Sequence, residues 1–187
     1  MKYIKISNLS AKAGIFLLLV FLTAPNIKSQ SDFSIGAYIG GGYISGNSPN
    51  QTSLNTSLFL QMKTILSDVI FLRFSFFYDR DIDYYLGTRS GYFPFIKGVT
   101  VKGIAVQDLA NNLFFEEGFG LLYINDRMFS NNNVNDFGTV FSLTGGTDLN
   151  KYTNLNVKLG VGLEYGLTFN NTLADYLSIH LQGQYFF

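Results

Sequence analysis

Residues 154–170 read NLNVKLGVGLEYGLTFN, and this stretch decides the fold. Every odd-numbered position from Leu155 to Phe169 is apolar or aromatic, whereas the even-numbered positions carry asparagine, lysine, glutamate, threonine or glycine. Side chains of a β-strand alternate between two faces, whereas a helix repeats its apolar positions about every 3.6 residues. The stretch therefore predicts one long strand with an apolar face and a polar or glycine-rich face.

The same period of two predicts seven further strands along the chain. Four regular segments lie at 33–43, 54–66, 70–78 and 177–187, and three less regular ones lie at 96–107, 113–124 and 137–144. A change of phase at Gly103 predicts a bulge. Glu117 would lie on the apolar face unless a bulge separates it from Glu116 or it sits near the rim. Polar connectors join the segments, which predicts an all-β, closed antiparallel up-and-down barrel of eight strands.

The contents of the two faces predict a transmembrane barrel rather than a lipocalin-like soluble barrel. Only 14% of the 187 residues are charged, against about 25% in an ordinary soluble domain. Glycine, serine, asparagine and glutamine dominate the polar face, which suits a lumen better than a solvated surface. Aromatic residues gather near the two expected rims: Tyr43, Tyr78, Tyr123 and Phe169 at one, and Phe33, Phe115, Tyr152 and Tyr185 at the other.

The N-terminal segment has the pattern of a secretory signal peptide. Lys2, Lys5 and Lys12 precede an apolar run at 14–22 that is shorter than the ~20 residues of a membrane-spanning helix. We expect cleavage after Ser29, giving a signal peptide at 1–29 and a barrel domain at 30–187; an uncleaved anchor is the alternative. Without residues 1–30 the chain keeps nine basic and 13 acidic side chains. A mildly acidic chain with no basic run is a poor candidate for binding nucleic acid.

The C-terminal segment Ile179-x-Leu181-x-Gly183-x-Tyr185-x-Phe187 resembles the last strand of small outer-membrane β-barrels of Gram-negative bacteria. The likeness is to barrels of the OmpX and OmpA-barrel type, especially the short β-barrel family common in Bacteroidota. It covers residues 31–187 as a pattern, and Gly183 departs from it. The resemblance implies that Tyr185 and Phe187 form the assembly signal that the barrel-assembly machinery recognises. We expect a monomer in the outer-membrane bilayer.

The residues needed for catalysis or metal binding are mostly missing. The chain has no cysteine and one histidine, which excludes thiolate sites and sites with two imidazoles. Ser178 and His180 share a strand face but are spaced ~6.6 Å along it, too far for a nucleophile and its base. Asp79-x-Asp81-x-Asp83 lacks the later ligands of a calcium loop. We therefore expect no enzyme, no metal and no cofactor.

The inward phase nevertheless carries several charges. The expected lumen residues are Lys63, Arg73, Lys102, Glu116, Lys158, Glu164 and His180. Because an eight-stranded barrel is only wide enough to be filled by side chains, these charges must be paired or hydrated. The sequence favours a non-enzymatic barrel with a structural or loop-presenting role. The alternatives are a narrow channel or carrier for small solutes and, with less support, a lipocalin-like soluble binder.

Overall fold

The computed structural model describes residues 32–46, 49–87, 91–109, 112–128, 133–150, 155–171 and 173–187. The expected signal peptide and Tyr152 lie outside these ranges. The strands are β1 (Phe33–Ser45), β2 (Gln51–Thr64), β3 (Ser67–Asp81), β4 (Phe95–Asp108), β5 (Leu113–Arg127), β6 (Val134–Asp148), β7 (Val157–Thr168) and β8 (Asp175–Phe186). A short helix, α2 (Asp83–Leu86), lies between β3 and β4. Within the described residues, no helix is long and apolar enough to span a membrane.

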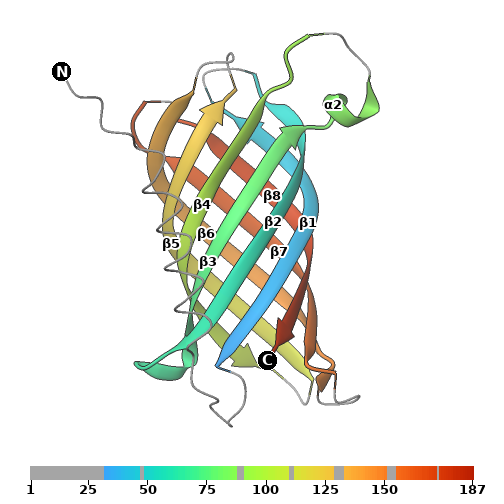
Figure 1. Cartoon of the computed structure of the whole chain (residues 1–187), viewed down its shortest axis with the longest axis vertical. Helices are drawn as coiled ribbons and strands as arrows, with labels where there is room; N and C mark the ends of the chain where they lie inside the picture. The colour runs from blue at the N-terminus through green and yellow to red at the C-terminus, as the bar shows by residue number, and fades with distance from the viewer. Residues whose placement is uncertain are drawn as a thin grey trace, which may run out of the picture. The chain divides into compact units, whose positions relative to one another are not determined.

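The strands pair in sequence order, and β8 closes on β1 to complete an antiparallel barrel (Figure 1). This confirms the predicted eight-stranded, closed, up-and-down architecture. The end that carries α2 and the β1–β2, β5–β6 and β7–β8 connections is called the loop end. The opposite end, where β1 begins and β8 finishes, is called the terminus end (Figure 1).

The bulge predicted at Gly103 is absent from the sheet, and so is the bulge that was one of two explanations offered for Glu117. β4 pairs with both neighbours in an unbroken register through Gly103, so the predicted bulge is wrong; Ile104 instead points inward and is buried. No bulge separates Glu116 from Glu117 either. Glu116 is buried in the lumen, and Glu117 faces outward near the terminus end of β5. The register shift that does occur lies at Lys63/Thr64, beside the β2–β3 turn.

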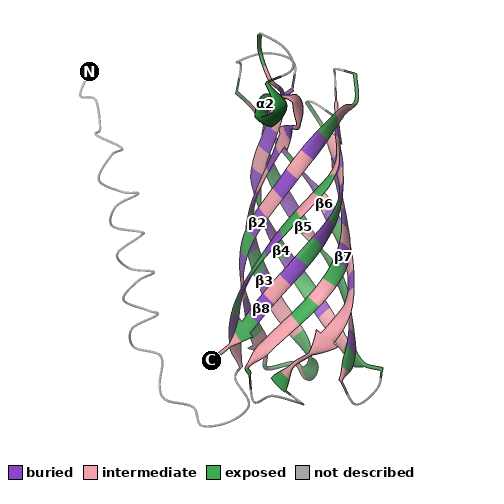
Figure 2. Ribbon diagram, turned by 90° about the vertical axis from the view of Figure 1, so that its right-hand side faces the viewer, coloured by how far each residue is buried: buried purple, intermediate pink, exposed green. Residues whose placement is uncertain are grey.

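The apolar face of the barrel points outward and the polar face points inward, which is the reverse of the arrangement in a soluble barrel. Outward-facing leucine, phenylalanine and isoleucine side chains are widely exposed, as in Leu58 (65%), Phe119 (67%) and Leu121 (72%). Buried positions alternate with them along every strand (Figure 2). Many of these buried side chains are polar or charged, including Gln61, Arg73 and Glu164. The outer face is the apolar face that the sequence predicts. Many of the polar side chains that can form hydrogen bonds point inward.

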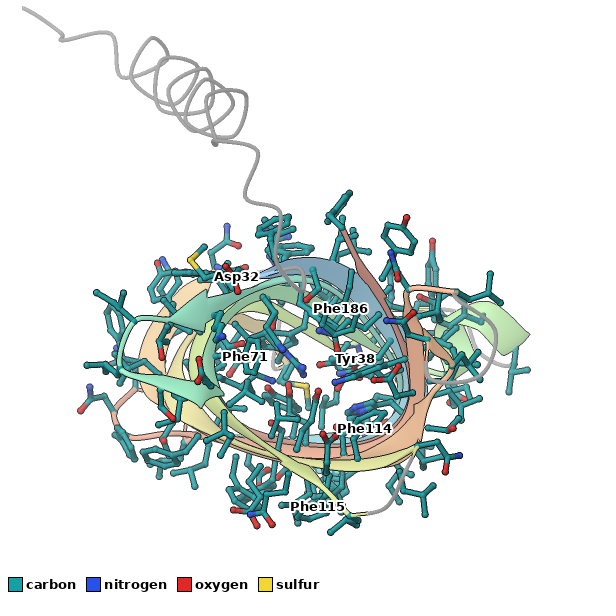
Figure 3. All side chains as sticks on the ribbon, turned by 90° about the horizontal axis from the view of Figure 1, so that it is seen from below. Asp32, Tyr38, Phe71, Phe114, Phe115 and Phe186 are labelled. Atoms are coloured by element: carbon teal, nitrogen blue, oxygen red, sulfur yellow. The ribbon has the colours of Figure 1, made fainter. Side chains whose placement is uncertain are left out.

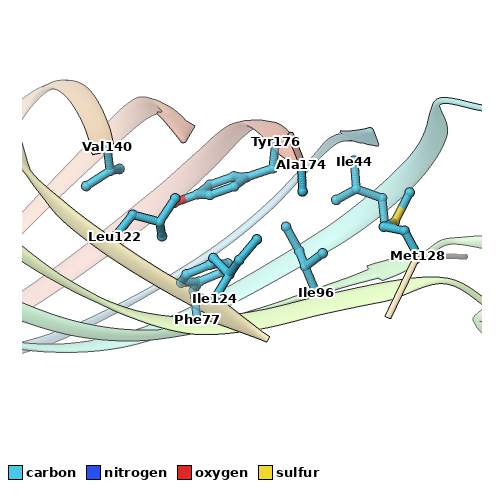
Figure 4. Close-up of a cluster of buried hydrophobic side chains, with 9 residues drawn as sticks. All are labelled: Ile44, Phe77, Ile96, Leu122, Ile124, Met128, Val140, Ala174 and Tyr176. Carbon is cyan, nitrogen blue, oxygen red and sulfur yellow. The ribbon is translucent and has the colours of Figure 1, made fainter. Parts of the chain in front are cut away.

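The loop end of the lumen holds an apolar cluster that the sequence analysis missed, beside buried polar side chains such as Asp79, Asp126 and Asp136. Nine buried side chains form a cluster, here called the apolar plug (Figure 4): Ile44, Phe77, Ile96, Leu122, Ile124, Met128, Val140, Ala174 and Tyr176. Members such as Phe77 and Leu122 stand at inward positions of strands whose outward positions are also apolar, so the alternation of hydropathy is lost there. Met128 and Ala174 lie just outside the strands. The plug lies inside the barrel toward the loop end and shares it with these polar side chains.

Inward-facing glycines allow the narrow wall to close. A Cβ placed on Gly42 would overlap the backbone carbonyl oxygen of Leu177 in the paired strand β8. On the adjacent, outward-facing Gly41, the nearest atom to such a Cβ is 3.7 Å away, an ordinary contact. The strong curvature of a small barrel therefore restricts side chains at Gly42 but not at Gly41.

We expect Gly42→Ala to destabilise the barrel by about 1–3 kcal/mol, because backbone must shift to admit the methyl group. Gly41→Ala is the matched control and should not destabilise, since alanine is favoured over glycine in a strand. Urea titration of each refolded variant measures the free energy of unfolding. Equal losses at both positions would contradict the tight approach at Gly42.

Candidate functional site: the barrel lumen

The first polar cluster in the lumen centres on Arg73 of β3. Its Nη2 lies 2.7 Å from Glu116 Oε2, and its Nε donates to Gln61 Oε1 at 2.8 Å. The guanidinium also stacks over the Phe59 ring, 4.3 Å from its centroid. Gln182 connects both charged groups, because its Oε1 accepts from Arg73 Nη1 and its Nε2 donates to Glu116 Oε2.

The second polar cluster centres on Glu164 of β7. Lys102 Nζ binds Glu164 Oε2 in a close ion pair. The hydroxyls of Tyr38 and Tyr176 both donate to Glu164 Oε1, at 2.9 and 2.8 Å. Three donors from three other strands therefore satisfy one buried carboxylate, which is the condition for burying such a charge.

Together the two clusters connect strands on opposite sides of the barrel through its lumen. The partners come from every strand except β6 and are far apart in sequence; Lys102 and Glu164, for example, are separated by 62 residues. Each cluster holds one cation and one carboxylate, so charge is balanced within each cluster. Figure 3 shows the interior occupied by side chains such as Tyr38 and Phe114, whereas Phe115 points away from it.

His180 lies between these clusters and has no catalytic partner set. Its ring stacks on Tyr38 with centroids 4.0 Å apart, and Gly162 leaves the space that the imidazole fills. Ser178 Oγ lies 3.4 Å from His180 Nδ1, so the separation inferred from strand spacing is wrong for these side chains. Both residues are nonetheless buried. In the described part of the chain no carboxylate hydrogen-bonds to His180, and no group of three metal ligands occurs.

The remaining sequence-predicted residues lie at the terminus end. Lys63 binds Asp68 at 2.7 Å and Asp32 at 3.9 Å, and its side chain is about one-third exposed. Lys158 Nζ lies over the rings of Phe114 and Phe186, 5.1 and 5.0 Å from their centroids. Tyr185 faces outward, and Phe187 packs edge-on against it. The structure therefore brings together Arg73, Glu116, Lys102, Glu164 and His180, and leaves both lysines outside that group.

Sequence reasoning missed the neutral partners. Tyr38, Tyr176, Gln61 and Gln182 all stand on the inward phase, so position alone could have identified them as lumen residues. Gly36 and Gly166 leave room for the Phe59 and Tyr176 rings, respectively. An inward glycine beside an inward aromatic residue is the signal that could have predicted this packing.

We expect Lys102→Met to destabilise the barrel by about 3–5 kcal/mol, because it leaves the Glu164 carboxylate buried without its cation. Lys102→Met combined with Glu164→Gln should cost less than Lys102→Met alone, since the amide keeps an acceptor for both tyrosines and carries no charge. Urea titration of refolded protein gives both free energies of unfolding.

Lys63→Met is the control, because its ion pairs are exposed at the rim and should contribute little. A double variant less stable than Lys102→Met would show that the buried charge is not the source of the cost.

Comparison with known proteins identifies the fold but not a family. No protein-family model matches the chain, and no curated protein matches it. Among solved structures, Neisserial surface protein A (NspA) matches with a TM-score of 0.63 and 8% identity, over 86% of this chain and all of that one. Ail, the attachment invasion locus protein of Yersinia pestis, matches with a TM-score of 0.55 and 11% identity, over 85% of this chain and all of Ail.

A second structure of Ail, in complex with the heparin analogue sucrose octasulfate, matches with a TM-score of 0.54 and 11% identity, over 85% of this chain and all of that one. At these identities the likeness concerns the fold alone. The chain has the fold of small eight-stranded outer-membrane β-barrels.

Proposed function

We propose that this chain is an exported, non-enzymatic outer-membrane β-barrel with a closed lumen, which stiffens the membrane or presents its loops outside the cell. Its outer face supports the membrane setting. Leucine, isoleucine, valine and phenylalanine side chains face outward on strands all around the barrel. Soluble monomers rarely expose apolar patches larger than a few hundred Å². A lipocalin-like soluble barrel would have to expose this entire surface to water.

Side chains occupy the lumen, and this observation is the main support for a non-conducting role. Two ion pairs with their hydrogen-bonding partners lie in the lumen, and the apolar plug lies toward the loop end together with buried aspartates such as Asp79 and Asp136. An ion crossing the barrel would have to break these buried pairs and pass nine packed apolar side chains. Such a path is costly, because each separated charge would lose its partner in a low-dielectric interior.

A narrow channel or carrier is the second candidate, favoured by the charged residues that face the lumen. For that function, the Arg73–Glu116 and Lys102–Glu164 pairs would have to separate, and the apolar plug would have to open. A membrane-facing enzyme is not favoured, because Ser178 and His180 are buried inside the barrel. Fold alone decides none of these activities.

Export, assembly and oligomeric state form the rest of the proposal. Residues 1–29 supply the signal peptide by their charge and apolar pattern. Tyr185 and Phe187 supply the C-terminal signal for the barrel-assembly machinery; both are exposed, on or just after the last strand. We further propose that the protein is monomeric and is related to the short β-barrel family of Bacteroidota, as its sequence resemblance implies.

Single-cysteine labelling tests the topology. Because the sequence has no cysteine of its own, only the introduced residue can react. Asn171 lies in the β7–β8 connection at the loop end, and Ile65 is fully exposed in the β2–β3 turn at the terminus end. In whole cells, we expect a membrane-impermeant maleimide to label Asn171→Cys and not Ile65→Cys. Both variants should react after the cells are lysed. The opposite pattern would place the loop end in the periplasm.

Conductance measurements separate the two candidate functions. We expect purified, refolded protein in planar bilayers to show no steady openings, because the polar clusters and the apolar plug fill the lumen. A vesicle flotation assay must first show that the protein is inserted. Steady single-channel openings from inserted protein would contradict the closed lumen and favour the channel.

A further inference from the structure

Four oxygen-bearing side chains lie together inside the loop end of the barrel, on two paired strands. They are Ser53 and Asn55 of β2 and Asp79 and Asp81 of β3, all of them inward-facing and buried. Asn55 is directly opposite Asp79 in the register of the two strands. Ser53 is opposite Asp81. Because directly opposed side chains have Cβ atoms ~4.5–5.5 Å apart and diagonal neighbours ~7–8 Å, these four residues can contact one small ion. They are here called the oxygen site.

Three buried oxygens of the oxygen site have no hydrogen-bond partner in the described part of the chain. They are Ser53 Oγ, Asn55 Oδ1 and Asp79 Oδ1. Asn55 Nδ2 donates to Asp79 Oδ2 at 3.0 Å, so turning the amide over would place two acceptors against each other. The amide and carboxylate oxygens that remain can only accept hydrogen bonds or bind a cation. Buried acceptors of this kind cost free energy unless a ligand satisfies them.

The negative charge of Asp79 is not compensated by a salt bridge within the described residues. The lumen cations Arg73 and Lys102 bind glutamates, and Arg73 stands six residues before Asp79 on β3, ~20 Å away along the strand. Asp79 is opposite Ile96 of β4 and follows Phe77 on the inward face, and both belong to the apolar plug (Figure 4). One amide donor in apolar surroundings does not compensate a buried carboxylate, whereas a bound cation does.

The ligand atoms of the oxygen site favour calcium. All four side chains offer oxygen, which hard cations such as Ca²⁺ and Mg²⁺ prefer to nitrogen or sulfur. Ca²⁺ takes about six to eight oxygens in a flexible arrangement, and carboxylates, asparagine oxygens and water are its usual ligands. Mg²⁺ demands a near-ideal octahedron and gives up its own water reluctantly. A site made from carboxylate, amide and hydroxyl oxygens on two strands therefore suits Ca²⁺ better.

Asp79-x-Asp81 also begins like a calcium-binding loop, and β2 supplies ligands that such a loop takes from later positions. The oxygen site thus has two carboxylates, with an amide and a hydroxyl oxygen in place of a third acidic group. Asp81 Oδ1 also accepts from the backbone N–H of Asp83 at 3.0 Å. Such a bond is compatible with metal binding, because carboxylates that ligate metals are themselves hydrogen-bonded.

We propose that the oxygen site binds one calcium ion inside the loop end of the barrel. Oxygens of the four side chains ligate the ion, and water completes its coordination. The ion supplies the positive charge that Asp79 lacks and joins β2 to β3 close to the point where both strands end. Calcium therefore stabilises the loop end of the folded barrel. The site goes beyond the proposed function and does not require a bilayer, because all of its ligands lie inside the barrel.

Urea titration of refolded protein with and without calcium tests the site. A nonionic detergent is used, so that no lipid phosphate binds calcium, and unfolding is measured in EGTA, CaCl2 or MgCl2 at equal ionic strength. Isothermal titration calorimetry of the folded protein gives the dissociation constant. Asp79→Asn keeps the size of the side chain and removes its charge. Asp68→Asn is the matched control, because Asp68 is exposed at the opposite end of the barrel.

We expect calcium to raise the urea midpoint of the wild-type protein, with a dissociation constant of about 0.1–1 mM, as in extracellular calcium modules. In EGTA, Asp79→Asn should be at least as stable as the wild type, because it removes an uncompensated buried charge. In calcium it should be the less stable of the two, since it binds the ion about ten-fold or more weakly. Asp68→Asn should respond to calcium as the wild type does.

A second variant separates calcium from the other ways of satisfying these oxygens. Asn55→Asp places another carboxylate opposite Asp79 and should enlarge the shift that calcium produces, since affinity rises with the number of charged ligands. If Asn55→Asp is destabilised equally in every solution, water or a proton on Asp79 satisfies the site and the proposal is wrong.

Three further results would also overturn the proposal. The absence of any calcium-dependent shift in the wild type would show that the oxygen site binds no calcium. Equal shifts in the wild type and in Asp79→Asn would place the calcium elsewhere on the protein. An equal shift with magnesium would contradict the choice of calcium.

Discussion

The burial of the Lys102–Glu164 and Arg73–Glu116 ion pairs is the constraint on which the rest of the structure depends. An apolar outer wall leaves no solvent-facing side for polar residues, so their side chains must be satisfied inside the barrel. Tyr38 and Tyr176 complete the hydrogen bonds of Glu164, and Gln61 and Gln182 do so around Arg73. A missing partner would leave a charge that neither water nor lipid can stabilise.

The volume of the side chains inside the barrel is constrained as well as their charge. Inward glycines stand beside the large rings they accommodate, as Gly36 does for Phe59 and Gly162 for His180. Because the eight-stranded wall leaves only enough room for side chains, each large residue requires a small one nearby. The apolar plug lies toward the loop end, beside buried aspartates such as Asp79 and Asp136. The interior is a packed core, even though much of it is polar.

The sequence was sufficient for the architecture because strand alternation is a local property. Residues 154–170 predict a strand without knowledge of any partner, and the apolar phase correctly identifies the outer face. Inward positions such as Phe59, Phe77 and Leu122 break the alternation, since a packed lumen also needs apolar volume. That ambiguity led to the wrong bulge at Gly103. The pairing of Lys102 with Glu164 could not be predicted, because it depends on which side chains face each other across the closed barrel.

Closure of β8 on β1 has a consequence for the time course of synthesis. Ser34, at the start of the barrel, accepts a hydrogen bond from Gln184, 150 residues later. Until that last strand arrives, β1 has an unpaired edge, and open strand edges readily recruit other chains. Closing so long a loop also carries an entropic cost that only the completed wall can offset. The nascent chain must therefore be kept apart from its own copies until β8 has been made, because no shorter fragment closes the sheet.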